Sequence, residues 1–326
     1  MKHVSILVPE TAVIEAVADP RYIFSAVNMF LQEAGKEALF NVQLVGLRKE
    51  VKLEGSIFSV HTDMLPEEVS QTDLIVIPAL SGDMTAAIEQ NKAFIPWIIH
   101  QYNKGAEVAS LCMGAFLFAA TGLLDGKRCS THWSRSNEFR KMFPLTELVD
   151  SCIITEEQGL YTSGGANSYW NLLVYLVEKY TDRATAILAA RYFAIEIDRD
   201  SQAAFMLFNG QRAHEDEEIK KAQDFIEEHY NDKLSVDQLA GRFAIGRRSF
   251  ERRFKKATSN TVAEYIQRVK MEAAKRSFET SRKNISEVML DVGYTDTKAF
   301  RTIFRKITGL TPVEYRNKYN KQMLVN

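Results

Sequence analysis

The chain has 326 residues and a formal net charge of only −1, from 41 Lys and Arg against 42 Asp and Glu. This length is enough for two domains that each bury a core of their own. The three cysteines are widely spaced, which argues against a disulfide framework or a metal site. No leader-like segment precedes the first apolar run, so we expect a reduced, soluble and cytoplasmic protein without a cofactor or metal.

From residue 1 to about 194, short apolar runs alternate with longer segments of helical period. The predicted strands are residues 4–8, 42–47, 57–60, 74–77, 108–111, 152–155 and 160–162. The predicted helices are residues 22–34, 86–102, 115–123 and 169–180. Continuous β-branched runs are typical of strands covered on both faces, and their alternation with helices favours parallel crossovers. The pattern predicts an α/β domain of the flavodoxin-like type, a parallel sheet between two helical layers.

Residues 195–216 lose this periodicity and predict a linker. Beyond them the helix signals are strong: an acidic run starts residues 217–230, Ser235 caps residues 236–243, and Gly246 precedes residues 247–258. Residues 262–279 form a long joining helix, followed by helices at 286–292 and 297–308 with a turn at Gly293 between them. We therefore predict an all-α domain over residues 217–326 with two helix-turn-helix units.

This segment contains its own near-copy at a spacing of 50 residues. The residues that recur unchanged in the second copy are Phe250, Phe254, Lys256, Thr258, Thr261, Glu264 and Tyr265. A period repeated twice indicates two copies of one helical module, because a solenoid needs about three or more repeats to bury its core. The paired phenylalanines stand four residues apart and are predicted to be core rather than stacking platforms for nucleic acid.

Charge separates this segment from the rest of the chain. Residues 233–318 hold 20 Lys and Arg against 9 Asp and Glu, a balance of +11, and the remainder carries −12. A basic module on an acidic partner is typical of polyanion binding, although a solvated charged face is the alternative. We expect double-stranded DNA as the partner.

The candidate DNA-binding residues lie on the second helix of each copy. They are Arg247, Arg248, Ser249, Glu251, Arg252, Lys255, Lys256, Thr297, Lys298, Arg301, Thr302, Arg305 and Lys306. Those near the helix starts are suited to reading bases in the major groove, and the four cations at 255, 256, 305 and 306 to phosphate contacts. Because the first copy carries more arginine, we expect it to supply more of the base contacts.

In the first domain, the most suggestive strand-to-helix junction is residues 109–115, with Cys112 on the turn. A thiol there is predicted to face solvent at the carboxyl edge of the sheet, where the helix N-terminus would favour the thiolate. A small buried residue, a residue of an effector pocket and a reactive redox thiol all remain open for Cys112. The candidate effector-pocket residues are Glu10, Glu15, Cys112, Met113, His132, Ser163 and Gly164.

Residues 234–316 closely resemble the DNA-binding domain of AraC-family transcription regulators. The resemblance rests on residues 291–294 (Asp-Val-Gly-Tyr), on Phe300, Phe304, Arg305 and Lys306, and on the closing residues 309–316. The first copy departs from that pattern, with Gly246 where a capping Ser is usual and Arg247 where Pro is common. This departure implies a looser start of the first reading helix.

The first domain resembles the PfpI-like branch of the class I glutamine amidotransferase superfamily. The resemblance rests on the turn at Cys112, on His132 twenty residues later and on the Ser163-Gly164 turn. Both domains together are similar to GlxA-type regulators, which implies a homodimeric sensor of an amine or amino-acid-derived effector, with RNA polymerase as a further partner. Enzymes of the superfamily carry His after the Cys, where this chain has Met113, so we assign no catalytic residue. Retained cysteine hydrolase or aldehyde-handling activity and redox sensing are the alternatives.

Overall fold

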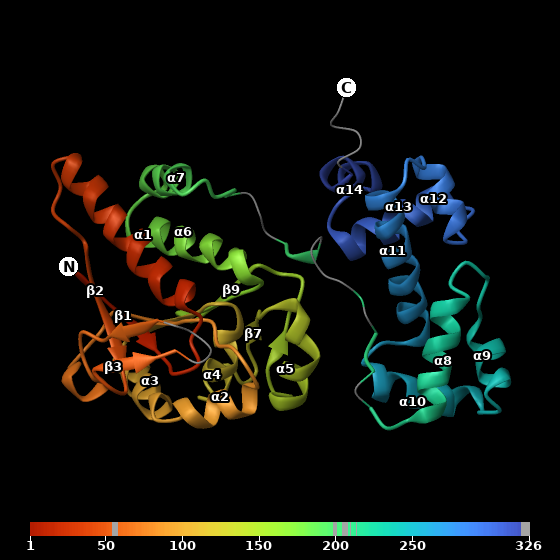
Figure 1. Ribbon diagram of the computed structural model, residues 1–326, viewed down its shortest axis with the longest axis horizontal. Helices are drawn as coiled ribbons and strands as arrows, with labels where there is room; N and C mark the ends of the chain where they lie inside the picture. Colours follow the sequence, from red (N-terminus) through yellow and green to blue (C-terminus); the bar gives the residue numbers. More distant parts are fainter. Residues whose placement is uncertain (54–57, 198–200, 204–207, 209, 213, 321–326) are drawn as a thin grey trace. The chain divides into compact units, whose positions relative to one another are not determined.

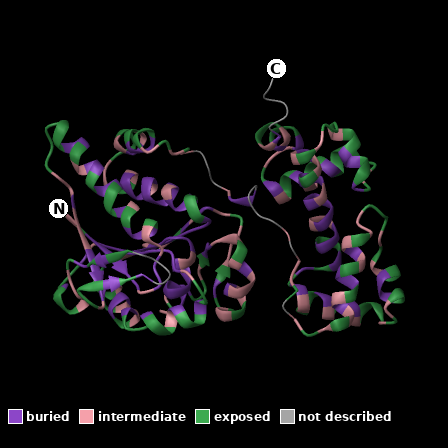
Figure 2. Ribbon diagram, in the orientation of Figure 1, coloured by how far each residue is buried: buried purple, intermediate pink, exposed green. Residues whose placement is uncertain are grey.

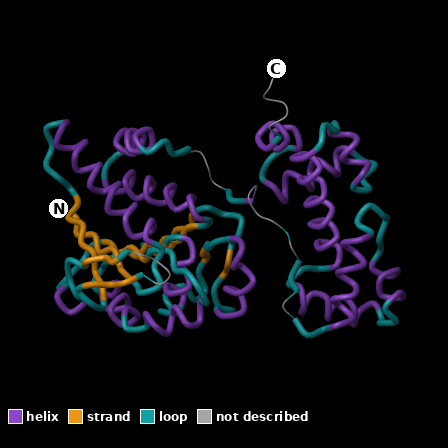
Figure 3. Tube along the Cα trace, viewed as in Figure 1, coloured by secondary structure: helices purple, strands orange, loops and turns teal. Residues whose placement is uncertain are grey.

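The structure is a computed structural model that describes residues 1–53, 58–197, 201–203, 208, 210–212 and 214–320. The chain divides into two compact units, Met1–Gln202 and Ala203–Asn326 (Figure 1). All described strands lie in the first unit, and the described regular structure of the second is helical (Figure 3). Of the predicted linker, residues 198–200, 204–207, 209 and 213 lie outside the described residues.

The centre of the first unit is a six-stranded sheet in the order β2-β1-β5-β6-β10-β9. Its first five strands pair in parallel, and the edge strand β9 runs antiparallel to β10. The strands are β1 (Lys2–Val8), β2 (Phe40–Gly46), β5 (Leu74–Ile77), β6 (Glu107–Ser110), β9 (Ile154–Glu157) and β10 (Leu160–Ser163). Two small sheets pair β3 (Glu50–Lys52) with β4 (Ser59–His61), and β7 (Arg128–Cys129) with β8 (Glu147–Leu148). The predicted parallel α/β fold is confirmed.

Helices cover both faces of this sheet (Figure 1). One layer holds α1 (Ile14–Glu33), α6 (Tyr169–Tyr180) and α7 (Arg183–Tyr192). The other holds α2 (Met84–Asn91), α3 (Phe94–Asn103), α4 (Ala115–Ala119) and α5 (Ser136–Met142). The central strands of this unit are buried (Figure 2). In β5, Leu74 and Val76 join the first core, whereas Ile75 and Ile77 join the second. This two-sided burial is why the strand reads as a continuous apolar run.

Several predicted bounds in the first unit were wrong. The helix predicted from residue 22 begins at Ile14, because α1 continues through Pro20, at the loss of one backbone hydrogen bond. The helix predicted over 86–102 is two helices, α2 and α3. Helices α5 and α7 and the short strands β3, β7 and β8 were not predicted. Ile57, at the start of one predicted strand, lies outside the described residues.

The second unit arranges six other described helices around the joining helix α11 (Val262–Thr280). The others are α8 (Glu217–Glu228), α9 (Val236–Arg242), α10 (Arg247–Thr258), α12 (Ile285–Asp291), α13 (Thr297–Thr308) and α14 (Pro312–Tyr319). One apolar cluster packs α8, α9 and α10 against the first half of α11, and another packs α12, α13 and α14 against its second half. The predicted helix-turn-helix pairs are therefore α9 with α10 and α12 with α13.

Several residues of the 50-residue repeat take the same structural role in both halves. Thr261 and Thr311 each form a capping box with the glutamate three residues on, starting α11 and α14. The hydroxyl of Tyr265 donates to the carboxylate of Glu227 at 2.5 Å, and the hydroxyl of Tyr315 donates to that of Glu279 at the same distance. The repeat therefore encodes two packed modules. Within the described residues, no helix is long and apolar enough to cross a membrane.

Candidate nucleic-acid interface and effector site

The reading helices α10 and α13 stand on matching apolar supports. Phe250 and Phe254 are fully buried with ring centroids 5.7 Å apart, and Phe300 and Phe304 are fully buried at 5.8 Å. This arrangement confirms that the phenylalanines are core. The opposite face of each helix points to solvent, because an amphipathic helix that buries one stripe must expose the other.

The predicted DNA-binding residues all belong to these exposed faces, except that Ser249 is half-buried. Arg247 is engaged within the protein, with its guanidinium 2.9 Å from a carboxylate oxygen of Asp237 and 3.5 Å from Glu251. Arg248 and Arg252 lie on the exposed face, and no ion pair joins either of them to another described residue. Contact of these residues with DNA stays a prediction.

The two reading helices begin differently, as the sequence suggested. Asp296 caps α13, and its carboxylate accepts from the backbone N–H groups of Lys298 at 2.7 Å and Ala299 at 3.0 Å. Gly246 precedes α10 and makes no side-chain cap. Instead, Arg253 fixes α10 through two hydrogen bonds of 2.6 and 2.9 Å to Asp216, the residue that caps α8.

Cations gather at the ends of both reading helices. Lys255 and Lys256 occupy the last turn of α10, and Arg305 and Lys306 the last turn of α13. A hollow of about 480 Å³ lies beside α10. The residues that line it include Val236 and Val262, the cations Arg252, Lys255 and Lys256, and the acidic Glu251.

In the first unit, Cys112 lies on the turn between β6 and α4 with a left-handed φ of 52°. Its backbone N–H donates to Ser163 Oγ at 3.2 Å, and its carbonyl accepts from Thr131 Oγ1 at 3.1 Å. The glycine two residues later is required by packing, because a Cβ on Gly114 would lie 2.4 Å from the carbonyl oxygen of Pro78. The turn is therefore closely packed against the neighbouring segments at the edge of the sheet.

The prediction that the Cys112 thiol faces solvent as a thiolate was wrong. The residue is 3% exposed. Burial raises the pKa of its thiol to about 12, and the neighbouring Met113 backbone N–H offsets this only in part. Burial of an ionisable thiol in apolar surroundings disfavours the charged form. Cys112 is therefore protonated at neutral pH, and the other two cysteines are buried (Cys129) and half-buried (Cys152).

The two carboxylates predicted for this pocket, Glu10 and Glu15, share no contact partner among the described residues. Glu10 pairs with Arg48 at 3.3 Å, and its backbone N–H donates to Asn91. Glu15 is exposed on the first turn of α1. Among the described contacts neither residue is bonded to Cys112.

The sequence did not single out Asp19, a half-buried carboxyl group on α1. Its carboxylate accepts from the Tyr169 hydroxyl at 2.6 Å, and burial raises its pKa, with the charge of Glu15 adding to the rise. Burial and the hydrogen bond to Asp19 raise the pKa of Tyr169, and the charge of Glu15 adds to the rise. Asp19 lies one turn after Glu15, a signal that the wrong helix start at residue 22 concealed.

His132 is half-buried beside Trp133, with ring centroids 5.3 Å apart. Burial lowers the pKa of its imidazole, and the charge of Arg135 lowers it further. Its Nδ1 lies 3.2 Å from the backbone nitrogen of Ser134, which donates to it. The ring is therefore neutral at physiological pH.

Gln202, which ends the first unit, fills the space beside the other predicted pocket residues. Its side-chain amide lies 2.6 Å from the position of a Cβ on Gly164, and Ser163 is fully buried next to it. Its Nε2 donates to the carbonyls of Asp150 at 2.7 Å and Thr131 at 3.1 Å, and its Oε1 accepts from the Gly165 N–H at 2.7 Å. No sequence signal pointed to this residue, which lies in the predicted linker.

Both units match known families. Residues 239–318 match the family model described as a helix-turn-helix domain, and residues 22–179 match the DJ-1/PfpI family. The chain therefore joins a DJ-1/PfpI domain to a helix-turn-helix domain of the AraC type. The fold of the first unit is also similar to that of a transcriptional regulator protein from Vibrio parahaemolyticus, at a TM-score of 0.53 and 20% identity over 59% of this chain and 98% of that one.

Curated relatives carry regulator names. The chain is 23% identical to the HTH-type transcriptional regulator ArgR of Pseudomonas aeruginosa over 66% of this chain and 65% of that one. It is 21% identical to the HTH-type transcriptional regulator CdhR of the same organism over 79% of this chain and 76% of that one. The match to ArgR thus spans just under two thirds of that relative's length.

Proposed function

We propose that the protein is a sequence-specific transcription regulator that binds double-stranded DNA through α10 and α13. The observation that carries the proposal is the pair of matching helices, each with a buried phenylalanine pair and an exposed cationic face. A net charge of +11 over residues 233–318 supplies the attraction to phosphate. The regulator names of the relatives support the same function.

The proposed roles divide along each helix. Arg248 and Arg252 in the first copy, and Lys298 and Arg301 in the second, contact base edges in two successive stretches of major groove. The cations in the last turns neutralise phosphates and carry no sequence information. Because Arg offers bidentate contacts to guanine, the first copy supplies the larger share of base recognition.

Selection from a pool of random duplexes tests this function, with the full chain as the selecting protein. We expect enrichment of a bipartite sequence. Alanine at Arg248 or Arg252 should cost about 1–3 kcal/mol in binding, concentrated on particular base pairs. A pool that enriches no sequence contradicts the proposal.

Arg253 provides the matched control for these variants. It lies on the same helix, but its guanidinium is held by Asp216 and does not belong to the reading face. Arg253→Ala should lower overall affinity without changing base preference. If instead Arg253→Ala alters the selected sequence while Arg252→Ala does not, the assignment of the reading face is wrong.

We further propose that the DJ-1/PfpI domain binds a small effector beside Glu15 and Asp19. These carboxylates stand one turn apart on α1 next to the Tyr169 hydroxyl, a group of acceptors that suits an amine. Amines and matched neutral alcohols, compared by the midpoint of thermal unfolding, test the proposal. An amine should raise the midpoint in the wild type and not in Asp19→Asn; equal effects of amine and alcohol exclude a charge-recognising site.

Chemistry at Cys112 is not part of this proposal. A buried thiol with a raised pKa is a poor nucleophile and a slow target for oxidants. Met113 occupies the position that a histidine base takes in the related enzymes, and His132 makes its described hydrogen bonds to Ser134. We therefore propose a binding role for the domain rather than turnover.

A further inference from the structure

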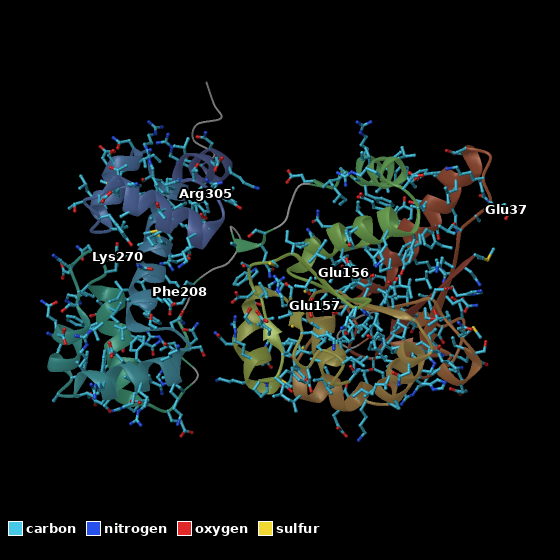
Figure 4. All side chains as sticks on the ribbon, turned by 180° about the vertical axis from the view of Figure 1, so that it is seen from behind. Glu37, Glu156, Glu157, Phe208, Lys270 and Arg305 are labelled. Carbon is cyan, nitrogen blue, oxygen red and sulfur yellow. The ribbon has the colours of Figure 1, made fainter. Side chains whose placement is uncertain are left out.

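A buried lysine lies where the two halves of the helical unit meet. Lys270 lies on the joining helix α11 (Figure 4). It is 7% exposed. Its ammonium donates to the carbonyl of Val292 at 2.9 Å, in the second half, and to that of Asp232 at 3.3 Å, in the first. It also lies 5.6 Å from the ring centroid of Tyr294. One side chain thus bonds the backbones of both halves.

The two backbones touch beside this ammonium. Gly293 has a left-handed φ of 72°, and a Cβ there would lie 2.1 Å from the carbonyl oxygen of Asn231 and 2.8 Å from Lys270 Nζ. Real Cβ atoms do not approach a carbonyl oxygen this closely, so this contact requires glycine. The segment after α8 and the turn after α12 therefore meet at a fixed point.

The apolar packing of the two halves is largely separate within the described residues. Their apolar clusters are separate along α11, ending at Val269 in one and starting at Met271 in the other. Among the partly buried apolar side chains of the described residues, Tyr230 alone packs against both clusters. A single helix bends and twists under load, so it fixes the angle between two domains less well than an additional contact off its axis.

Burial of an ammonium is costly unless its donors are bonded. Lys270 has two backbone carbonyls for its three donors, and burial lowers the pKa of its amine. Keeping the ammonium charged at this place therefore costs free energy, which the second carbonyl helps to offset. Loss of either half's carbonyl would leave the ammonium under-bonded, which couples the position of one half to that of the other.

We propose that Lys270 is a positioning residue that sets the spacing and rotation between α10 and α13, and so the distance between the two blocks of base pairs that the protein reads. The inference rests on the proposed DNA-binding function. Each base pair advances the groove by about 3.4 Å and rotates it by about 34°. A rigid reader must therefore reject sites whose blocks are displaced by a single base pair.

The test uses the full chain and the bipartite duplex obtained by selection, with blocks also moved one base pair closer and one further apart. The wild type should lose about tenfold or more in affinity on either shift, and Lys270→Met less than about threefold. Arg276→Met is the control, because it removes an exposed cation from the same helix. It should weaken binding at every spacing alike.

Equal spacing penalties in the wild type and Lys270→Met overturn the inference and leave the proposed function intact, whereas a failed selection removes the function itself. Circular dichroism establishes that each variant folds. If Lys270→Met does not fold, Gly293→Ala replaces it, because an added Cβ pushes Asn231 away while the ammonium remains. Gly293→Ala should also reduce the loss of affinity on the shifted duplexes. An unchanged loss refutes the proposed role of the contact between the two halves.

A second measurement needs no DNA. Spin labels at two exposed positions in opposite halves, Glu228→Cys on α8 and Leu290→Cys on α12, report the distance between the halves by pulsed electron resonance. Cys152→Ser removes the native cysteine that is not fully buried. Lys270→Met should broaden the distance distribution, and Arg276→Met should not. A distance distribution of equal width in the wild type, Lys270→Met and Arg276→Met contradicts the proposed positioning role of Lys270.

Discussion

Gln202 should stabilise the first unit more than an ordinary buried glutamine does. The change is Gln202→Ala, and the control is Gln101→Ala, since both residues are 1% exposed in the same unit. Gln101 donates one hydrogen bond, to the Val69 carbonyl, and its Oε1 has no partner. Both variants remove the same side-chain volume, so the comparison isolates the additional hydrogen bonds of Gln202.

The expected difference follows from these bonds. Gln202 makes two short bonds beyond the single bond of Gln101, and its removal also leaves the buried N–H of Gly165 without an acceptor. At about 1 kcal/mol for each bond, Gln202→Ala should cost about 2 kcal/mol more than Gln101→Ala in the free energy of unfolding.

Urea unfolding followed by tryptophan fluorescence measures this difference. All three tryptophans of the chain, at positions 97, 133 and 170, lie in the first unit, so the signal reports that unit alone. Equal costs for the two variants would refute the reasoning, because they would show that the amide contributes only its volume.

The stability of Gln202→Glu, measured as a function of pH, tests the same contacts. Its second oxygen would face the carbonyls of Asp150 and Thr131, which disfavours the charged form and raises the folded pKa above the unfolded value of about 4.3. Stability relative to the wild type should therefore be greatest at acid pH and be lost as pH rises through the folded pKa. A pH-independent difference would contradict the arrangement of these carbonyls.

Three further outcomes follow from the described contacts. Because burial raises the pKa of Asp19, Asp19→Asn should stabilise the first unit at neutral pH and lose that advantage below pH 4; a constant difference across pH by urea unfolding would show that the carboxyl is not strained. Cys112 should resist iodoacetamide in the native chain at pH 8 and react after unfolding, as peptide mass measurement will show, and rapid native labelling would disprove its burial. Asp296→Ala should cost about 1 kcal/mol through loss of the α13 cap, lowering the melting temperature of the helical unit by circular dichroism, and an unchanged melt would mean that the cap contributes nothing.

The helical unit was largely predictable from sequence. Capping residues such as Ser235, apolar period and the 50-residue repeat are local signals, and they placed α10 at residue 247 and α13 at residues 297–308. These signals act over a few residues, so no knowledge of distant packing is needed. Which exposed side chains touch DNA still rests on inference from that geometry.

The sensor site was less predictable, because its chemistry depends on long-range contacts. The sequence placed Cys112 on a strand-to-helix turn, but packing of this residue into the first apolar core decided that its thiol is buried and protonated. The wrong start of α1 concealed Asp19, whose partner Tyr169 lies 150 residues away in the chain.

By itself, the sequence determined two units of opposite charge, a parallel α/β fold and a duplicated helical reader, since each follows from composition, period or repetition. Only the tertiary structure decided that Gln202 fills the site beside Gly164 and that Lys270 bonds both halves of the reader. The physical reason is the same for both residues. A polar side chain reads as solvent-exposed in sequence, and its burial becomes evident only when the distant carbonyls that satisfy it are brought to its side.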